Sequence, residues 1–270
     1  MSLIVFNTFG TSSGASSSTA KTGQTIQNAF AQLSSGSRFS SASIDAAGLA
    51  IAADLSSSLA SISQGARNAS DTASALSIAD GALEQVSNIT SRLQEIAVTS
   101  ANGVYSDQQR SALQNEYSAL TAEIQRISDT TSYNGQKLLD GSSISAELGG
   151  SSVNISGINL SELAQSVASQ DVSTSAGAQD AVAALQNFSD SLTSQRGASV
   201  DAGLARLGSV QDTLSSAKAV TATALSQASD TDFASAISDL NRAKALQQYQ
   251  VSALSSMNQL QASLIKELSA

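Results

Sequence analysis

The sequence predicts a mainly α-helical protein: a long antiparallel helical bundle or coiled coil, with a small β-hairpin-containing central insertion and paired N- and C-termini. Three observations support this fold class. None of the 270 residues is proline, the residue that most strongly interrupts helices. Apolar residues recur at steps of three and four over several long segments. Turn pairs and alternating β-branched residues gather only around residues 134–157.

The clearest helical pattern lies between residues 76 and 96, where leucine, isoleucine, valine and alanine share one face. A heptad rhythm from Leu113 to Ile127 predicts a second helix, and Ser106 with Gln109 forms a capping box at its start. The Ala-Asn-Gly sequence at 101–103 is typical of a helix end. Two antiparallel helices joined by a short turn follow, the first from about residue 44 to 100.

The middle of the chain predicts a short insertion at residues 141–178. Asp140-Gly141 is a turn pair, and SSVNISGINL at 151–160 alternates small polar and β-branched residues as a hairpin does. Helical spacing resumes at Val182 and continues to Ala217. Residues 179–229 are therefore predicted to be the C-terminal part of a long rod, whose N-terminal part is residues 44–140.

Both ends of the chain predict amphipathic helices, a short one within residues 1–43 and a longer one over 230–270. Asp230 is the expected N-cap of the second, with Asp232 in its first turn. A lone helix pair has no third layer in this sequence, and single helices are marginal in water. We therefore predict that their apolar residues pack against other subunits: Ile26, Phe30, Leu33, Phe233, Ile237, Leu240, Leu254, Leu260 and Leu264.

A serine- and glycine-rich connector, LSSGSRFSSASIDAAGLAI at residues 33–51, separates the first terminal helix from the long helix. Ser43 is predicted to cap the long helix, with Asp45 favourable in its first turn. The small residues that follow, among them Gly48, would let that helix lie close to a partner.

Composition excludes several classes of function. The net charge of −9 opposes binding to nucleic acid, which attracts lysine and arginine. With no histidine and no cysteine, the common nucleophile–histidine arrangements and histidine-based metal sites are impossible. Phosphate-binding glycine motifs are absent as well. We predict no catalytic, cofactor-binding or metal-binding residues, no cofactor and no enzymatic activity. The opening MSLIVFNTFG lacks a basic segment, and no apolar run approaches the ~18 residues of a membrane span, so neither a cleaved signal nor membrane insertion is expected.

Several ordered blocks resemble bacterial flagellin. The connector RFSSASIDAAGLAIA (38–52) is similar to the family's arginine followed by Asp-Ala-Ala-Gly-x-Ala-Ile. Further matches are QGARNASDTASALSIADGALEQV (64–86), RLQEIAVTSAN (92–102), SYNGQKLLDG (132–141) and DTDFASAISDLNRAKALQQYQVSALSSMNQ (230–259). The chain departs from the family at VFNTFG, which keeps only Asn7 and Thr8 of an Ile-Asn-Thr-Asn pattern, and at its LIKELSA end. Its centre is short, which implies little or no variable outer domain.

The resemblance implies a structural subunit that polymerises into the extracellular flagellar filament for swimming. Residues 1–43 and 230–270 would form its inner core, and 44–140 with 179–229 the surrounding shell. Gly36, Arg38, Asp45 and Gly48 would belong to the spoke between them. Export would proceed through the flagellar channel without a cleaved signal peptide.

The implied partners are further copies of the chain, an export chaperone, and cap and junction proteins. The positions Arg92, Ile96 and Glu116 fall where flagellins contact the innate immune receptor for flagellin. Two alternatives remain at this stage. One is a hook–filament junction protein of the same superfamily, and the other is a secreted helical effector or adhesin that stays monomeric.

Overall fold

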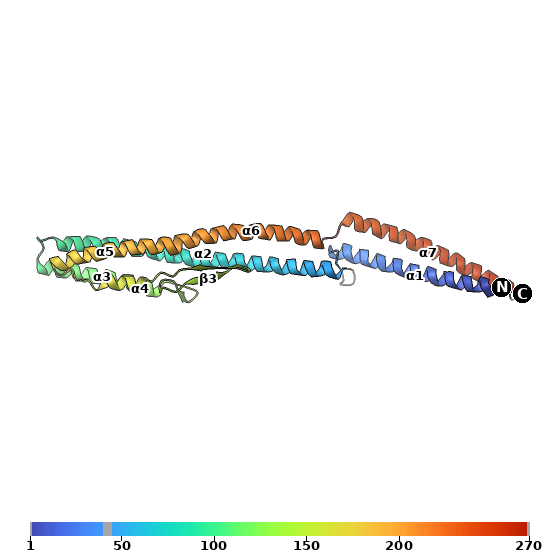
Figure 1. Cartoon of the computed structure of the whole chain (residues 1–270), viewed down its shortest axis with the longest axis horizontal. Helices are drawn as coiled ribbons and strands as arrows, with labels where there is room; N and C mark the ends of the chain where they lie inside the picture. The colour runs from blue at the N-terminus through green and yellow to red at the C-terminus, as the bar shows by residue number, and fades with distance from the viewer. Residues whose placement is uncertain (1, 40–44, 269–270) are drawn as a thin grey trace. The chain divides into compact units, whose positions relative to one another are not determined.

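The computed structural model describes the backbone of residues 2–39 and 45–268, and side chains of 14–39, 45–263 and 266. It confirms a mainly helical protein with small antiparallel strand pairs (Figure 1). The helical elements are α1 (Ser2–Ser35), α2 (Ala46–Ala101), α3 (Asp107–Thr130), α4 (Leu160–Ala168), α5 (Ser175–Arg196), the π-helical segment η1 (Gly197–Asp201), α6 (Ala202–Ser229) and α7 (Phe233–Leu268). The strands are β1 (Ser132–Tyr133), β2 (Gln136–Lys137), β3 (Ile144–Glu147) and β4 (Ser152–Ile155).

The chain forms two compact units. The terminal unit comprises residues 1–57 and 221–270, and the central unit comprises residues 58–220. Helices α2 and α6 each contribute residues to both units.

In the central unit, the predicted turn between α2 and α3 is present. The Ser106 side chain accepts a hydrogen bond from the Gln109 backbone N–H, and the Gln109 side chain accepts one from the Ser106 N–H, which completes the capping box. Arg110 is buried beneath this turn and donates hydrogen bonds to the carbonyls of Asn102 and Tyr105, at 3.1 and 2.8 Å. A guanidinium thus satisfies backbone groups that the end of α2 leaves without helical partners.

Two hairpins follow α3. In the first, β1 pairs with β2 around Asn134 and Gly135, whose φ values of 49° and 80° suit a two-residue hairpin turn. The second differs from the prediction, because its strands are β3 and β4 and only β4 lies in the 151–160 segment. The sequence at 144–147 carries one isoleucine and one alanine, too little alternation to reveal the first strand.

A short helix, α4, was missed in the insertion. Asn159 caps it by accepting a hydrogen bond from the Glu162 N–H at 3.1 Å. Leu160, Ala164 and Val167 form its buried face. Three apolar residues at helical spacing are too few to distinguish this nine-residue helix from a strand by pattern alone.

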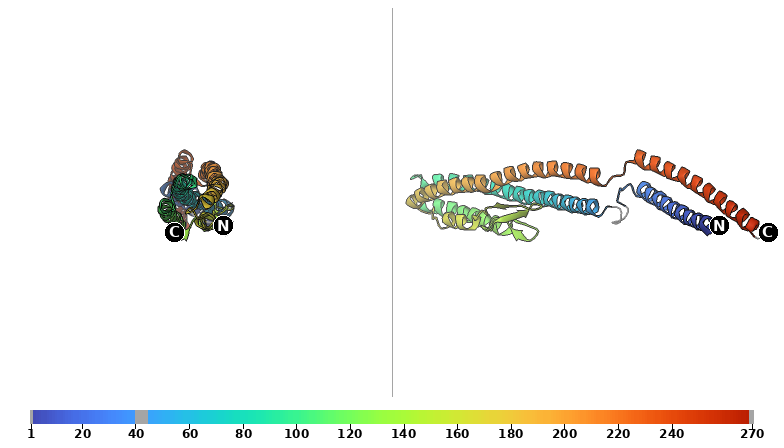
Figure 2. Two further views of the ribbon diagram at one scale, coloured as in Figure 1. Left: turned by 90° about the vertical axis from the view of Figure 1, so that its left-hand side faces the viewer. Right: turned by 45° about the vertical axis from the view of Figure 1, so that its right-hand side comes forward.

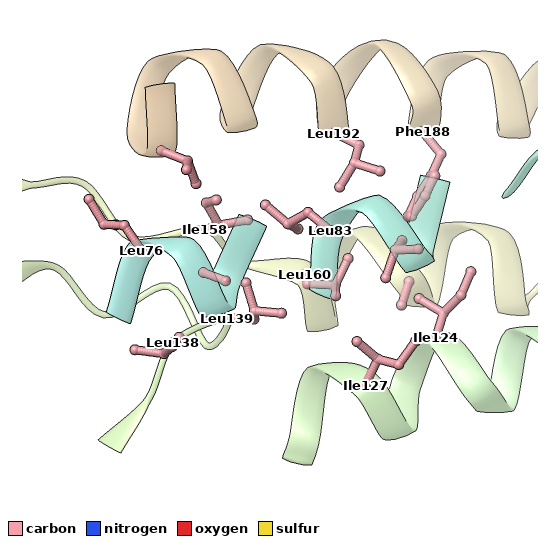
Figure 3. Packing of buried hydrophobic residues seen from close by; sticks show 14 of the residues in the cluster. Leu76, Leu83, Ile124, Ile127, Leu138, Leu139, Ile158, Leu160, Phe188 and Leu192 are labelled. Atoms are coloured by element: carbon pink, nitrogen blue, oxygen red, sulfur yellow. The ribbon is translucent and has the colours of Figure 1, made fainter. Parts of the chain in front are cut away.

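The core of the central unit lies where α2, α3, α4, α5 and the hairpins meet (Figure 3). Leu83 of α2 lies below Leu192 and beside Phe188 of α5, Leu76 lies further along the core near Leu139 and Ile158, and Ile124 of α3 enters from another side. These side chains are almost fully buried. The predicted apolar face of α2 is therefore the centre of an intramolecular core.

The β3–β4 hairpin packs closely on α2 at Gly65. A Cβ atom at Gly65 would lie 2.6 Å from the carbonyl carbon of Leu148, in the hairpin turn. A Cβ at Gly149, on the hairpin side, would lie 2.9 Å from the carbonyl oxygen of Ser61. Only residues without a side chain allow the two backbones to approach this closely.

The returning helical segment was predicted as continuous over about 180–228, and it is helical from α5 through α6. Within it, η1 has π-helical hydrogen bonding, which the sequence did not indicate. Arg196 at the end of α5 binds Asp80 of α2 through two hydrogen bonds of 2.7 and 3.1 Å. This ion pair joins the two helices beside the π-helical segment.

In the terminal unit, α1 and α7 lie side by side, and the beginning of α1 is next to the end of α7 (Figures 1 and 2). The prediction of a short N-terminal helix was wrong, because α1 has 34 residues. Its serine- and threonine-rich part lacks an apolar stripe, but its hydroxyls bond back to the helix. Thr19, Thr22 and Thr25 each donate to the carbonyl four residues earlier, at 3.0–3.1 Å.

The start of α7 also differs from the prediction. Asp232 rather than Asp230 caps the helix, because its carboxylate accepts hydrogen bonds from the N–H groups of Ala234 and Ser235, at 3.0 and 3.2 Å. Asp230 instead forms an isolated β-bridge with Ser37. At the other long helix, Ser43 lies outside the described residues, and Asp45 accepts the capping hydrogen bond from the Gly48 N–H at 2.9 Å.

Candidate assembly surface and connector

The terminal unit is held together by a thin contact between α1 and α7. Its buried side chains are mostly small: Ala29 on α1 faces a stripe on α7 that includes Ala236, Leu240 and Ala243. Each alanine methyl contributes about 0.8 kcal/mol when buried, far less than a leucine. The pair therefore has a small core for its length.

Large apolar side chains of the same unit remain exposed. Phe30 is 62% exposed, Leu260 61%, Phe233 52% and Ile237 48%. These four were predicted to contact other subunits, and in the single chain about half or more of the surface of each is exposed. Ile26, Leu33 and Leu254 are half-buried.

Two predicted contact residues fall elsewhere. Leu240 is 8% exposed, so it packs inside its own unit rather than on its surface. The side chain of Leu264 lies outside the described residues. Both are on α7, and spacing alone does not decide which residue of an apolar stripe meets α1.

Further exposed apolar residues of the terminal unit were not predicted: Ile51 on α2, and Leu246 and Tyr249 on α7. The two on α7 lie between the predicted positions, so α7 is apolar on more than one face. A helix of this kind has to be covered on more than one side. The breadth of the apolar pattern over 246–260 was the signal available in the sequence.

Within the terminal unit, backbone hydrogen bonds link the connector to the short break between α6 and α7. The Arg38 N–H donates to the Ser229 carbonyl at 2.7 Å, and the Thr231 N–H donates to the Gly36 carbonyl at 3.0 Å. Gly36 has φ 69°, the left-handed conformation that glycine adopts readily at the end of a helix. The break between α1 and α2 is thus bonded to the break between α6 and α7.

The predicted spoke residues Arg38, Asp45 and Gly48 come together around Phe39. A Cβ at Gly48 would lie 2.4 Å from the Phe39 ring, so the ring occupies the space that any other residue would fill. The Arg38 guanidinium lies 4.8 Å from the centroid of this ring and 3.9 Å from the Asp45 carboxylate. Phe39 is buried and was not predicted. We call these four residues the clasp.

On the central unit, Arg92 and Glu116 lie together on the surface. Arg92 Nη2 is 2.8 Å from Glu116, and Nη1 is 2.8 Å from Glu95. The hydrogen bond that Arg92 donates to Glu95, and then those it donates to Glu116, raise the pKa of Arg92 above its usual value. Ile96, predicted as part of the same contact, is only 2% exposed and belongs to the core. Ile96 lies on the buried face of α2, and for this reason it cannot take part in a surface contact together with Arg92 and Glu116.

The polar groups inside the central unit have structural partners. Tyr117 donates its hydroxyl hydrogen to the Val167 carbonyl at 3.0 Å, and burial raises the pKa of Tyr117 to about 12. Among residues 2–39 and 45–268, acidic side chains form no cluster of three or more that could hold a metal ion.

By length and composition, α2 is the one helix of the described chain that could cross a membrane. Only 11% of the qualifying window is buried within the chain, and a single window of this kind is weak support for a membrane span. It shows that the window is apolar and largely uncovered in the single chain.

The comparisons with known proteins agree with this architecture. The bacterial flagellin N-terminal helical region matches residues 6–144, and the bacterial flagellin C-terminal helical region matches residues 182–268. A flagellin of Halalkalibacterium halodurans is 32% identical over 247 residues, which cover 86% of this chain and 88% of that relative. A B-type flagellin of Pseudomonas aeruginosa is 46% identical over 117 residues, 43% of this chain but only 24% of that relative.

Among solved structures, a flagellar hook-associated protein from Vibrio parahaemolyticus has a TM-score of 0.58 and covers 69% of this chain and 100% of its own. At 14% identity, this likeness concerns the fold alone. The matched regions comprise both parts of the helical rod and nearly all of both terminal helices. The chain belongs to the bacterial flagellins, and it is a structural subunit of the flagellar filament.

Proposed function

We propose that the terminal unit supplies the inner-core contacts between copies of this chain in the filament. The observation that carries the proposal is the combination of a thin α1–α7 contact with exposed Phe30, Phe233, Ile237 and Leu260. Burial of a large apolar side chain contributes about 1.5–3 kcal/mol, so covering these residues would stabilise a polymer considerably. Ile26, Leu33 and Leu254 would complete their burial in the same contacts, whereas Leu240 stabilises the α1–α7 pair.

A matched pair of substitutions on α7 tests this role. Leu260→Asp should abolish seeded polymerisation, because it places a charge in the proposed apolar contact. Gln259→Asp adds the same charge at the neighbouring exposed position and should polymerise far better. Equal polymerisation of the two variants would contradict the assignment. Removing residues 231–270 should likewise prevent polymerisation while the central unit retains its core.

The clasp and the bonded helix breaks form, in this proposal, the spoke between inner core and outer shell. Gly36, Arg38, Asp45 and Gly48 would fix the path of the chain there. The proposal assigns a role to each part of the chain. Residues 1–43 would form an inner-core helix and the spoke, and residues 230–270 the second inner-core helix. Residues 44–140 and 179–229 would form the shell, with 141–178 as a short insertion. Proline at Ala42 tests the spoke, because it should change filament shape and motility while the helical content of the monomer stays close to wild type.

Export without a cleaved signal peptide, and contacts with an export chaperone, a cap and junction proteins, belong to the same proposal. Their support is family membership. Mass determination of the intact protein in sheared filaments tests the first, because loss of an N-terminal segment would contradict it. Copy number in the same filaments distinguishes a main subunit from a junction protein.

A second candidate function is recognition by the innate immune receptor for flagellin. The specific observation is that Arg92 and Glu116 are exposed and hold each other in a fixed geometry. Ile96 would act only by supporting α2 from the core. The double variant Arg92→Glu with Glu116→Arg keeps an ion pair between the two positions but exchanges the places of the positive and the negative charge. Unchanged receptor signalling by this variant would remove the two residues from the contact.

A further inference from the structure

Gly81 lies in the interior of α2, where glycine is less favourable than alanine. Packing explains two other glycines of this helix, because a Cβ at Gly48 or Gly65 would lie within 3 Å of other atoms of the chain. A Cβ at Gly81 would meet none of the described heavy atoms within 4 Å. Nothing in the single chain therefore accounts for this glycine, whereas a close neighbour from outside would.

A groove opens beside Gly81, between α2 and α3. Its volume is about 360 Å³, enough for more than one side chain. Ile78 and Ala82 of α2 and Ile127 of α3 supply apolar lining, and Arg126 forms part of the wall. Ile78 is 44% exposed, so it gives the groove a patch of apolar surface beside the polar side chains of Gln85, Thr130 and Thr131.

Elsewhere on the same unit, Val104 projects from the turn between α2 and α3. At 83% it is the most exposed large apolar side chain of the described residues. Hydrogen bonds hold the backbone of this turn in place. Buried Arg110 donates to the carbonyls of Asn102 and Tyr105, and the Asn102 side chain accepts a hydrogen bond from the Val104 N–H at 3.2 Å. The turn thus presents a preorganised apolar knob, which lowers the entropic cost of binding.

We propose that Val104 of one copy of this chain inserts into the groove beside Gly81 of the next copy. The inference rests on the proposed function, since it names one contact within the polymer. Knob and groove lie at different places on the central unit, so a head-to-tail contact between them is heterologous. Repetition of a head-to-tail contact produces an open helical assembly where the rotation does not close a ring, as a filament requires.

Charge on the two surfaces favours the same pairing. Asp107 begins α3 three residues after Val104, and the guanidinium of Arg126 lies on the groove wall. Glu123 already binds Arg126 through Nε at 2.7 Å. Arg92 of the same chain binds two glutamates at once, which shows that one guanidinium can serve two carboxylates. Arg126 can therefore pair with Asp107 of the next copy without losing Glu123.

The natural chain has no cysteine, so disulfide cross-linking can test the contact. Gln85 lines the same groove and is exposed, so a cysteine there leaves the space beside Gly81 open. The full-length double variant Val104→Cys/Gln85→Cys is polymerised on filament seeds and oxidised with diamide. We expect a ladder of covalent multimers on a non-reducing gel. A mixture of the two single variants should stop at dimers, because each copy then carries one thiol. Val104→Cys/Gly208→Cys is the control, since Gly208 is likewise a helical position with open space around it but does not line the groove.

A second variant makes the test independent of cysteine chemistry. Gly81→Ala should raise the melting temperature of the monomer by about 2–4 °C, because alanine favours the helix and meets nothing in the chain. The same change should shorten seeded filaments, because the methyl group occupies the space of the incoming knob. A purely structural role for Gly81 would not move these two readouts in opposite directions.

The outcomes separate this inference from the proposed function. A wild-type chain that does not polymerise contradicts the proposed function. If the wild type polymerises, the inference is overturned by no ladder from the Val104–Gln85 pair, or by an equal ladder from the Gly208 control. It is also overturned if Gly81→Ala gives filaments as long as those of the wild type.

Discussion

Replacing Gly48 by alanine should loosen the connector, although helix propensity alone predicts the opposite. Alanine is about 1 kcal/mol more favourable than glycine inside a helix. At this position, however, the new Cβ would lie 2.4 Å from Cζ of Phe39 and 2.6 Å from Oδ2 of Asp45. Forcing an extra methyl into a packed site costs about 1–3 kcal/mol, and expelling the Phe39 ring would cost a similar amount of burial. The net effect is a loss of about 1 kcal/mol in clasp stability.

Hydrogen exchange measures this loss locally, at the first turn of α2. The N–H groups of Gly48 and Leu49 bond to Asp45, and in Gly48→Ala they should exchange about five times faster than in the wild type. Gly48→Ala combined with Phe39→Leu should recover part of the protection, because the smaller side chain makes room. Slower exchange in Gly48→Ala alone would refute the reasoning, since propensity would then outweigh the clash.

Three further predictions concern the central unit. The raised pKa of Tyr117 implies that stability is intact below about pH 10 and falls by up to ~1.4 kcal/mol per pH unit towards pH 12; Tyr117→Phe should remove this dependence in alkaline unfolding. Gly65→Ala should lower the free energy of unfolding by about 1–3 kcal/mol, because its Cβ would clash with Leu148, and an unchanged urea midpoint would contradict that packing. Asp80→Asn should cost only about 0.5–1 kcal/mol, because the ion pair with Arg196 is partly exposed, and the difference from wild type should shrink in high salt.

The helices of the central unit could be predicted because their burial follows their spacing. Leu76, Leu83 and Val86 recur at steps of three and four or their sums, and all three are buried in one core. The capping box at Ser106 was equally readable, because it depends on residues three positions apart. Such local signals require no knowledge of which other segment lies opposite.

Other features depend on contacts that spacing does not contain. The length of α1 escaped prediction because its helix has threonine and serine hydroxyls bonded to its own carbonyls in place of an apolar stripe. Phe39 looked like one apolar residue in a polar connector, and only the folded chain places it against Gly48. Leu240 and Ile237 look alike in the sequence, yet α1 covers the first and leaves the second exposed.

The bonded breaks between the helices have a mechanical consequence. Any tension transmitted along the backbone through this unit passes through residues 36–39, which follow α1, or through the stretch from the end of α6 at Ser229 to the start of α7 at Phe233. Backbone hydrogen bonds link these two stretches in both directions, from Arg38 to Ser229 and from Thr231 to Gly36. Two segments of the chain that are hydrogen-bonded in this way share a load that would otherwise act on one of them. Pulling α1 and α7 together away from α2 and α6 should therefore rupture both stretches in one event, at a higher force than either interruption could bear alone.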